Sequence, residues 1–412
     1  MNPLHLSGWG VKIRVNNLKP CSELEITDGR EDDRTQSTIR FRPRRFRHNA
    51  IIISGHSGYV SLQGLHWLSK NRIPVFVMNY DGTVISSILP PVPIKADLRA
   101  AQFQAASDTR KKFTIAHALV KAKIVRSLQV LDWLGKRYDI ERETQTTKGE
   151  ASKLGNAGTV SQLRTVEGRV ALRYWEAFKK ILPEWLDFQG RMTATTHQNN
   201  ASDPFNAALN YGYGFLEAEC RMAINAVGLE PAIGFLHEPN AHQTRESLVY
   251  DVMEIGRWLV DVSVVMAFES GLLKLRDFFF TGDDYRYRFE SEARQRFIDL
   301  IRERFNLGAL YKGQVLKWDT VIQQKVTELG RFLTGRLSEL DFMEPAPSLD
   351  RQDDRELRTK ILSLTSSEAK RLGIPKQSLH DLRVKSRSGR SFKLYAGTRR
   401  KLAQLEKHPS IS

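Results

Sequence analysis

Cysteine is nearly absent from this sequence of 412 residues: only Cys21 and Cys220 occur, and there is no Cys-x-x-Cys pair. This excludes a disulfide framework and a zinc site built from cysteines, and it fits a reducing compartment. Long apolar runs are also missing, because the longest, residues 258–268, contains Asp261 and is too short to cross a bilayer. Residues 1–15 lack the apolar core of a secretory leader. We therefore expect a cytoplasmic protein without membrane attachment.

Several common catalytic motifs are absent too. No Walker phosphate loop, Rossmann glycine fingerprint or serine nucleophile elbow occurs. His237 and His242 are five residues apart with Pro239 between them, whereas a zinc protease carries two histidines four apart on one helix face. The sequence therefore gives no local indication of nucleotide-driven chemistry, a serine hydrolase or a zinc protease.

Acidic residues are too few to balance the basic ones. There are 63 Lys and Arg against 47 Asp and Glu, a formal net charge of +16. Residues 351–412 alone hold sixteen basic and six acidic residues, so most of the excess lies in the last part of the chain. A charge of this size indicates a polyanionic partner, nucleic acid before a membrane surface.

The first ninety residues predict a β-rich domain. Short runs with alternating apolar residues are separated by turn residues, and one helix is expected at 62–70. Asp81-Gly82 between residues 75–77 and 84–85 predicts a hairpin, because this dipeptide tolerates positive φ. Pro90, Pro91 and Pro93 then form a rigid break.

After residue 95 the apolar period predicts helices throughout, apart from a Thr-rich loop at 142–158, with Thr159 capping the next helix. A second break lies at 344–354, where Pro345, Pro347 and acidic residues gather. The predicted fold class is therefore α+β. It comprises a β-rich domain at 1–92, a large all-α catalytic domain at 95–343 and a small basic helical tail at 358–412.

Four residues are candidates for the chemistry. Glu167 lies on the apolar stripe of its helix, where a carboxylate needs a partner; pairing with a neighbouring arginine is the simpler alternative. Asp251 and Glu254, three apart at the start of a helical run from 248 to 268, share a face, which suits metal ligands and equally suits stabilisation by the helix dipole. His237 ends an apolar run and, taken alone, reads as a hydrogen-bonded loop histidine.

The context of these residues resembles the ordered motifs of the CRISPR-associated integrases that insert spacers. The motifs are Thr165-Val166-Glu167-Gly168-Arg169, Phe205–Tyr213, Gly234-Phe235-Leu236-His237 and Ser247–Glu254 followed by Arg257. Gly58-Tyr59-Val60-Ser61 and Ile73–Val77 extend the resemblance into the β-rich part, so it covers about residues 1–345.

The resemblance implies that Glu167, His237 and Glu254 hold a catalytic divalent metal, and that Asp251 is a supporting or alternative ligand. Two carboxylates and an imidazole suit Mg²⁺ or Mn²⁺. It further implies that 3′-hydroxyl ends of a donor DNA attack a target at staggered positions, without a nucleotide cofactor. The resemblance also implies that the chain forms a homodimer through residues 1–92 and a tetramer on DNA.

The tail departs from the spacer-inserting enzymes. Ala369, Leu372, Gly373, Leu379 and Leu382 have helix-turn-helix spacing, although a plain helical hairpin shares that pattern. Its second helix would offer Gln377, Ser378 and Asp381 to a major groove, with Lys376, Arg383 and Lys385 beside the phosphates. An integrase with such a tail resembles the casposases, the transposases of casposon mobile elements, whose donor ends carry terminal inverted repeats.

Two alternatives stay open at this point. One is a spacer integrase of CRISPR adaptation with an extra tail, which would share the same catalytic residues. The other is a DNA-binding regulator without catalysis, which the tail alone supports and which the intact Glu167, His237 and Glu254 oppose.

Overall fold

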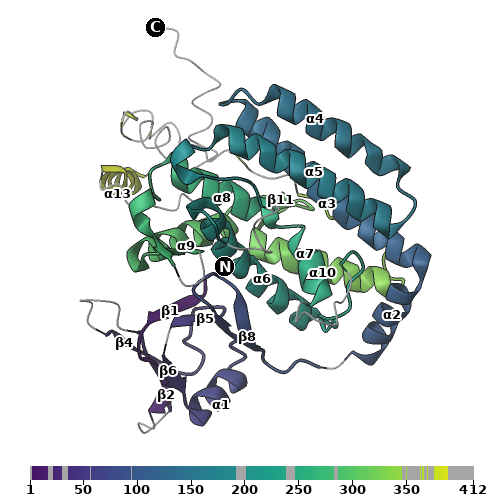
Figure 1. Cartoon of the computed structure of the whole chain (residues 1–412). Coiled ribbons are helices and arrows are strands. Elements are labelled where there is room, and N and C mark those ends of the chain that lie inside the picture. The colour runs from purple at the N-terminus through teal and green to yellow at the C-terminus, as the bar shows by residue number, and fades with distance from the viewer. Residues whose placement is uncertain are drawn as a thin grey trace. The chain divides into compact units, whose positions relative to one another are not determined.

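The computed structural model describes residues 2–16, 22–29, 36–55, 57–93, 95–191, 201–237, 246–282 and 286–345, and from the tail 349, 362, 364–365, 369 and 375–387. It divides into two compact units, Met1–Pro347 and Ser348–Ser412. The predicted α+β class is confirmed: strands dominate the first ninety residues and helices the rest (Figure 1). No helix in these described ranges is long and apolar enough to span a membrane.

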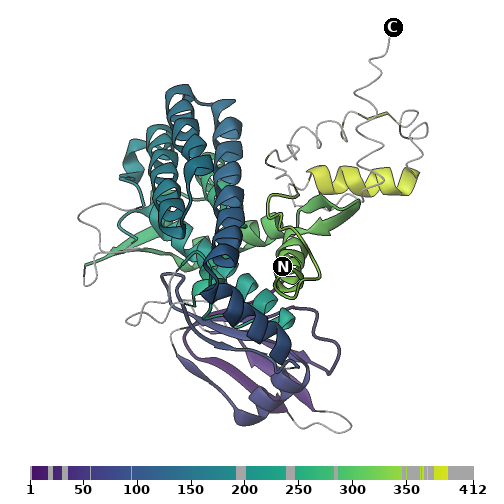
Figure 2. The same cartoon turned by 90° about the vertical axis from the view of Figure 1, so that its right-hand side faces the viewer.

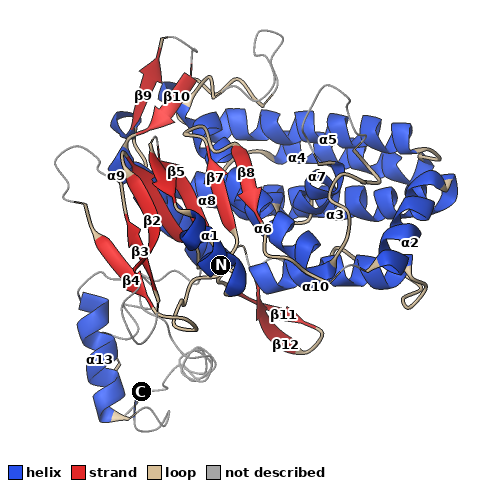
Figure 3. Cartoon of the chain, turned by 90° about the horizontal axis from the view of Figure 1, so that it is seen from below, coloured by secondary structure: helices blue, strands red, loops and turns tan. Residues whose placement is uncertain are grey.

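Two four-stranded sheets make up the β-rich part (Figure 3). One has the order β1-β5-β7-β8 and the other β4-β3-β2-β6. In chain order the strands and the helix between them are β1 (Leu4–Gly8), β2 (Val11–Asn16), β3 (Glu23–Thr27), β4 (Thr38–Phe41), β5 (Ile51–Gly55), β6 (Gly58–Val60), α1 (Leu62–Lys70), β7 (Val75–Met78) and β8 (Val84–Ile88).

Alternation along the strands decides which face is buried. In β2, Val11 and Ile13 enter an apolar core shared by the two sheets, while Lys12 and Arg14 point to solvent. Helix α1 closes this core with Trp67 and Leu68 and has the predicted bounds.

The predicted Asp-Gly hairpin is confirmed and joins the β-rich part to the helices. Gly82 has a φ of +88° between the antiparallel strands β7 and β8. A Cβ at Gly82 would lie 2.4 Å from the Cα of Tyr211, so only glycine lets this turn approach the long helix α6 so closely.

Nine α-helices and three 3₁₀ turns are described between residues 95 and 345. They are α2 (Ala96–Ser107), α3 (Thr109–Gly135), α4 (Glu141–Ala151), η1 (Ser152–Asn156), α5 (Val160–Ile181), η2 (Glu184–Leu186), α6 (Pro204–Val227), α7 (Ser247–Met253), α8 (Arg257–Glu269), η3 (Leu275–Asp277), α9 (Ser291–Phe305) and α10 (Trp318–Leu333). Helices α3, α4 and α5 lie side by side (Figures 1 and 2). Helix α6 is buried almost all round, as expected for an apolar central helix.

Two expectations about this part are wrong. The Thr-rich segment forms α4 and η1 instead of a loop, because Thr144 and Thr147 are buried where α4 packs against α5 and α3. The chain after residue 95 is also not purely helical. It contains two hairpins, β9 (Phe278–Thr281) with β10 (Arg286–Phe289) and β11 (Gly308–Tyr311) with β12 (Gln314–Lys317). Aromatic residues favour the first hairpin, and Gly313, at a φ of +80°, permits the turn of the second.

The helical run expected from 248 to 268 is interrupted. Helix α7 ends at Met253 and α8 begins at Arg257, and a tight turn joins them. Its bonds run from the N–H of residue i to the carbonyl of residue i−3, for example 2.9 Å from Gly256 N to Met253 O. Glycine at 256 lets this turn rest on α6, because a Cβ there would lie 2.7 Å from Leu216 Cδ1. The break places Glu254 in the turn.

The second unit contains helix α13 (Lys376–Arg387). Leu379 is buried, Leu382 is half-buried, and Gln377 and Ser378 are exposed, in agreement with the predicted orientation of this helix. The segment 366–374, which would complete the predicted helix-turn-helix, lies outside the described residues apart from Ala369, so that motif stays a prediction.

Candidate active site

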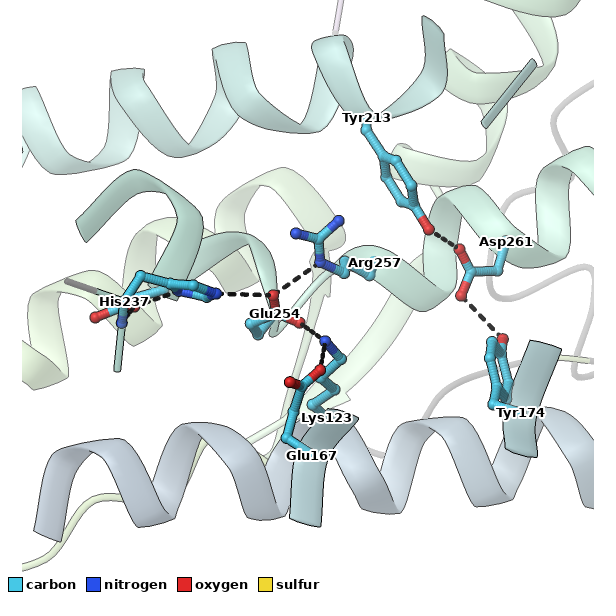
Figure 4. Close-up of polar contacts among 9 residues, drawn as sticks. Lys123, Glu167, Tyr174, Tyr213, His237, Glu254, Arg257 and Asp261 are labelled. Carbon is cyan, nitrogen blue, oxygen red and sulfur yellow. Dashed lines mark hydrogen bonds and ion pairs between the residues drawn. The ribbon is translucent and has the colours of Figure 1, made fainter. Parts of the chain in front are cut away.

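Glu167, His237 and Glu254 come from three separate elements of the helical part and converge (Figure 4). Glu167 lies on α5, His237 in the segment after α6, and Glu254 in the turn between α7 and α8. A fourth residue, Lys123 of α3, stands between the two carboxylates. Its Nζ lies 2.8 Å from Glu254 Oε2 and donates a hydrogen bond to Glu167 Oε1.

Helix α5 sets the position of Glu167. Its buried stripe of Leu163, Val166, Val170 and Tyr174 confirms the predicted inner face, and Glu167 sits at the edge of that stripe with 21% of its side chain exposed. Thr159 caps the helix as expected, accepting a hydrogen bond from the Gln162 N–H. The carboxylate therefore reaches the site from the rim of a rigid helix.

Asp251 holds the segment that carries His237. Its carboxylate is fully buried and accepts hydrogen bonds from the backbone N–H groups of Phe235 (2.5 Å), Leu236 (3.0 Å) and His237 (3.0 Å). Gly234 makes this wrapping possible, because a Cβ there would meet Asp251 Oδ2 at 2.8 Å. Of the two roles expected for Asp251, the geometry favours support of His237.

The same carboxylate orients the imidazole. His237 Nδ1 lies 2.8 Å from Asp251 Oδ1, which favours the tautomer with hydrogen on Nδ1. This leaves Nε2 turned toward Glu254, 4.0 Å from its Oε1 (Figure 4). The ring is 39% exposed, so an incoming ligand can reach it.

Glu254 carries a charge that its neighbours hold in place. Burial opposes its negative charge, but Arg257, Lys123 and His237 outweigh that effect and lower the pKa of Glu254 to about 2. Arg257 Nε donates to Glu254 Oε1 at 2.9 Å. Burial also opposes the charge on Lys123, yet the carboxylates of Glu254 and Glu167 raise its pKa. Glu254 and Lys123 therefore stay charged at neutral pH.

A pocket of about 220 Å³ opens beside these charges. Arg191, Arg257, Tyr213 and Asp261 are among its lining residues, together with the ring of Trp175. Tyr213 and Tyr174 donate to the two oxygens of Asp261 at 2.6 and 2.9 Å. Burial raises the pKa of Asp261 to about 6, although the tyrosine hydrogen bonds act the other way. The pocket therefore offers cationic and aromatic surface next to Glu254.

Sequence reasoning missed Lys123 and the role of Asp261. Lys123 is one of many lysines, and nothing local marks it. Asp261 did carry a signal, because an acid inside the apolar run 258–268 must find buried donors.

A divalent metal is compatible with this donor set, although no group of three described His, Cys, Asp or Glu side chains stands at metal-binding distances. The ammonium of Lys123 lies where a cation would neutralise both carboxylates. Glu254 Oε2 is buried, with the Lys123 ammonium 2.8 Å away. Two carboxylates and an oriented imidazole match the preferences of Mg²⁺ and, better, Mn²⁺. The residues therefore fit such an ion, provided that Lys123 gives way.

Among the tail candidates, Gln377 and Ser378 are exposed on α13. Arg383 is half-buried and its guanidinium donates to the Leu364 carbonyl, so it also ties the tail together. The side chains of Lys376, Asp381 and Lys385 lie outside the described residues.

Comparison with known proteins identifies the family. The profile described as CRISPR associated protein Cas1 matches residues 34–303, about two thirds of the sequence, and the chain belongs to this family. The CRISPR-associated endonuclease Cas1 of Methanopyrus kandleri is 34% identical over 243 residues, covering 58% of this chain and 70% of the relative. A Cas1 endonuclease of Archaeoglobus fulgidus is 28% identical over 302 residues, covering 69% and 86%.

Solved structures support this assignment. A casposase bound to integration product has a TM-score of 0.80 and 33% identity, covering 88% of this chain and 99% of that one. A Cas1 protein from Thermotoga maritima shares the fold, with a TM-score of 0.63 at 18% identity and coverage of 82% and 98%. The resemblance predicted from the motifs is confirmed.

Proposed function

We propose that this chain is a metal-dependent DNA integrase of the casposase type, which joins 3′-hydroxyl ends of a mobile element to staggered positions in target DNA. The observation that carries the proposal is the convergence of Glu167, His237 and Glu254 beside a cationic pocket. The likeness to a casposase bound to integration product supports it.

Glu167, His237 and Glu254 would hold Mg²⁺ or Mn²⁺. When bound, such an ion stabilises the negative charge that develops on a phosphate under attack. The chain's own residues do the rest. Asp251 fixes the imidazole so that Nε2 faces the site. Arg257 and Arg191 present guanidinium groups to the pocket, where they can neutralise and orient a DNA phosphate.

The reaction needs no energy source. A 3′-oxygen of the donor forms a bond to phosphorus as the 3′-oxygen of the target strand leaves with its electron pair, so one phosphodiester bond replaces another. The proton of the attacking hydroxyl passes to solvent and one returns to the leaving oxygen. Two such steps at staggered positions leave gaps, and host repair of these gaps duplicates the target site.

A strand-transfer assay with a short 3′-hydroxyl donor duplex and a supercoiled target tests the proposal. Glu167→Ala, His237→Ala and Glu254→Ala are each expected to lower joining more than about 100-fold while leaving DNA binding, measured without metal, largely intact. Glu176→Ala on the same helix and His66→Ala on α1, both changes of exposed side chains, are the matched controls. Near wild-type joining with Mn²⁺ by any of the first three variants would show that the residue is not a ligand.

Assembly follows from the staggered reaction. Attack on both strands requires two active sites at a fixed separation, so we propose a dimer formed through residues 1–92, and a dimer of dimers when two donor ends are held together. Measuring the mass of the protein on donor DNA checks this. An active complex with a single chain would contradict it.

Spacer insertion in CRISPR adaptation is the alternative, favoured by the names of the curated relatives. Both activities use the same catalytic residues, so site variants cannot separate them. Donor preference can: a casposase-type enzyme should prefer ends with terminal inverted repeats and join them without a second protein, whereas a spacer integrase should direct any short duplex to a repeat array.

A further inference from the structure

Arginine is concentrated in one stretch of the β-rich part that has no acidic residues. Between residues 34 and 80 there are eight Lys and Arg and no Asp or Glu. Five of the eight lie at 40, 42, 44, 45 and 47, where β4 ends and the chain turns toward β5, and all five are exposed. We call residues 40–47 the arginine turn. It belongs to the β-rich part of the chain, whereas the candidate active site belongs to the helical part.

The backbone of the arginine turn is strained at Arg44. The Arg45 N–H donates to the Arg42 carbonyl at 3.0 Å, and Pro43 and Arg44 occupy the middle of the turn. Arg44 has a φ of +63°, a conformation that glycine or asparagine adopts at much lower cost. An arginine there costs roughly 1 kcal/mol, and strain of this kind gathers at functional sites.

Rigid support lies directly under the turn. The ring of Phe46 packs edge-on against Phe41 and His48, with centroids 4.8 and 5.3 Å apart. Asn49 and Asn2 exchange hydrogen bonds at 3.0 and 3.2 Å, which anchors the end of the segment. The guanidinium groups therefore project from a preformed scaffold, and binding through them loses little conformational entropy.

The neighbouring sheet face continues the positive surface. Arg14, Glu25 and Arg40 are cross-strand partners on β2, β3 and β4, and both arginines bind the Glu25 carboxylate. Arg42 binds Glu23 in the same manner. Lys12 on the same face is also exposed, so the basic side chains there outnumber the carboxylates of Glu23 and Glu25. The arginines at 44, 45 and 47 add to the excess.

We propose that the arginine turn and the outward face of β2, β3 and β4 bind the phosphate backbone of duplex DNA. Guanidinium groups pair with phosphates through two hydrogen bonds, and a row of them on a rigid turn suits a regular polyanion. A contact with a second copy through this face fits poorly, because two-fold symmetry would bring two such positive faces together, so the proposed dimer would use another surface of residues 1–92. The proposal rests on the proposed function only in taking DNA as the polyanion that this protein handles.

Binding of a random-sequence duplex by the full chain tests the proposal. Fluorescence anisotropy is measured in EDTA at several salt concentrations for wild type and for the triple variant Arg44→Asn, Arg45→Gln, Arg47→Gln. Each lost phosphate contact lowers the slope of log K against log salt by about 0.9, so the slope should fall by roughly 2 to 3. Affinity at about 0.1 M salt should fall at least roughly tenfold, equally for random duplexes and donor ends, because phosphate contacts carry no sequence information.

The matched control removes the same charge elsewhere. Arg110→Gln, Arg331→Gln and Arg336→Gln neutralise three exposed arginines of the helical part and should leave the slope nearly unchanged. A triple variant with lysine at 44, 45 and 47 should retain most of the slope. If the asparagine and glutamine variant does not fold, the lysine variant and the single change Arg44→Gly carry the test, and Arg44→Gly alone should lower the slope by about one unit.

Other results would overturn the proposal. Equal slopes for the arginine-turn triple and the control triple would show that this surface makes no phosphate contact. A triple variant that keeps the wild-type slope but loses its dimer in solution would assign the surface to a contact between copies. DNA binding is measured here without metal, and strand transfer is measured in a separate assay. If the wild-type protein fails to join DNA in that second assay, the proposed function is contradicted but the DNA-binding result is unaffected.

Discussion

The fully buried carboxylate of Asp251 offers the sharpest test of how the site is held together. Asp251→Asn keeps the shape of the side chain and replaces one oxygen by an NH₂ group. In the native protein, Oδ2 accepts from the N–H groups of Phe235 and Leu236, and Oδ1 accepts from the N–H and Nδ1 of His237. Whichever way the amide turns, two of these four donors then face another donor.

The cost follows from these contacts. A hydrogen bond to a charged acceptor contributes about 1.5–3 kcal/mol, and a buried donor left without an acceptor costs about 1–3 kcal/mol. Loss of two such bonds should therefore destabilise the segment by roughly 3 kcal/mol, which is about a 100-fold change in its opening equilibrium. The imidazole also loses the partner that fixes its tautomer, so joining should fall about 10- to 100-fold.

Amide hydrogen exchange measures the effect where it occurs. Exchange at Phe235, Leu236 and His237 should accelerate about 100-fold in Asp251→Asn, while the core strands of the β-rich part keep their protection. Asp108→Asn is the control, because Asp108 also accepts two backbone N–H bonds but caps an exposed helix start, where asparagine serves equally well. Unchanged exchange at 235–237 with unchanged joining would refute the assigned role of Asp251.

Three further predictions concern the charges around the site and the tail. Lys123→Met leaves the carboxylates of Glu167 and Glu254 facing each other, so the metal-free protein should lose about 2–4 kcal/mol, and Mn²⁺ should raise the unfolding midpoint of this variant more than that of wild type. Asp261 has a raised folded-state pKa of about 6, so the stabilisation present at low pH is lost as pH rises from about 4 to 6. Asp261→Asn should remove up to roughly 3 kcal/mol of that pH dependence in urea unfolding. Truncation after Leu349 should weaken discrimination between matched and scrambled donor ends in competition binding while short preformed ends are still joined; equal discrimination would make the tail a clamp that does not read sequence.

Structural features that depend on residues close together in the sequence could be predicted from the sequence. The Asp81-Gly82 hairpin, the bounds of α1 and the inner face of α5 follow from turn chemistry and periodicity, and the structure confirms them. Helix α4 was beyond such reasoning, because its threonines are polar and are stabilised by packing against other helices. The break at Glu254 was hidden for a similar reason. Apolar residues run through it, so their spacing gives no sign of the turn, and the close packing of Gly256 against Leu216 of α6 is a contact between distant parts of the chain.

The candidate site shows the same division. The motif context singled out Glu167, His237 and Glu254, and the structure brings these three side chains together. Nothing in the sequence distinguished Lys123, because its two contacts join it to residues on α5 and on the turn after α7, far along the chain. The assignment of Glu167, His237 and Glu254 as metal ligands stays a prediction, and the proposed alanine variants test it.

The charges of the site couple the binding of the two proposed ligands, a divalent metal ion and a DNA phosphate. Lys123 and Arg257 form ion pairs with Glu167 and Glu254, and the formal charges of these four residues sum to zero before any ligand binds. Arg191 and Arg257 line the pocket, yet a DNA phosphate placed beside Glu167 and Glu254 would still add negative charge next to two carboxylates, which is costly in a region of low dielectric. A divalent cation held by the same carboxylates would supply the missing charge and release the ammonium of Lys123 toward the phosphate. Metal and DNA should therefore bind cooperatively, each raising the affinity for the other by the same factor.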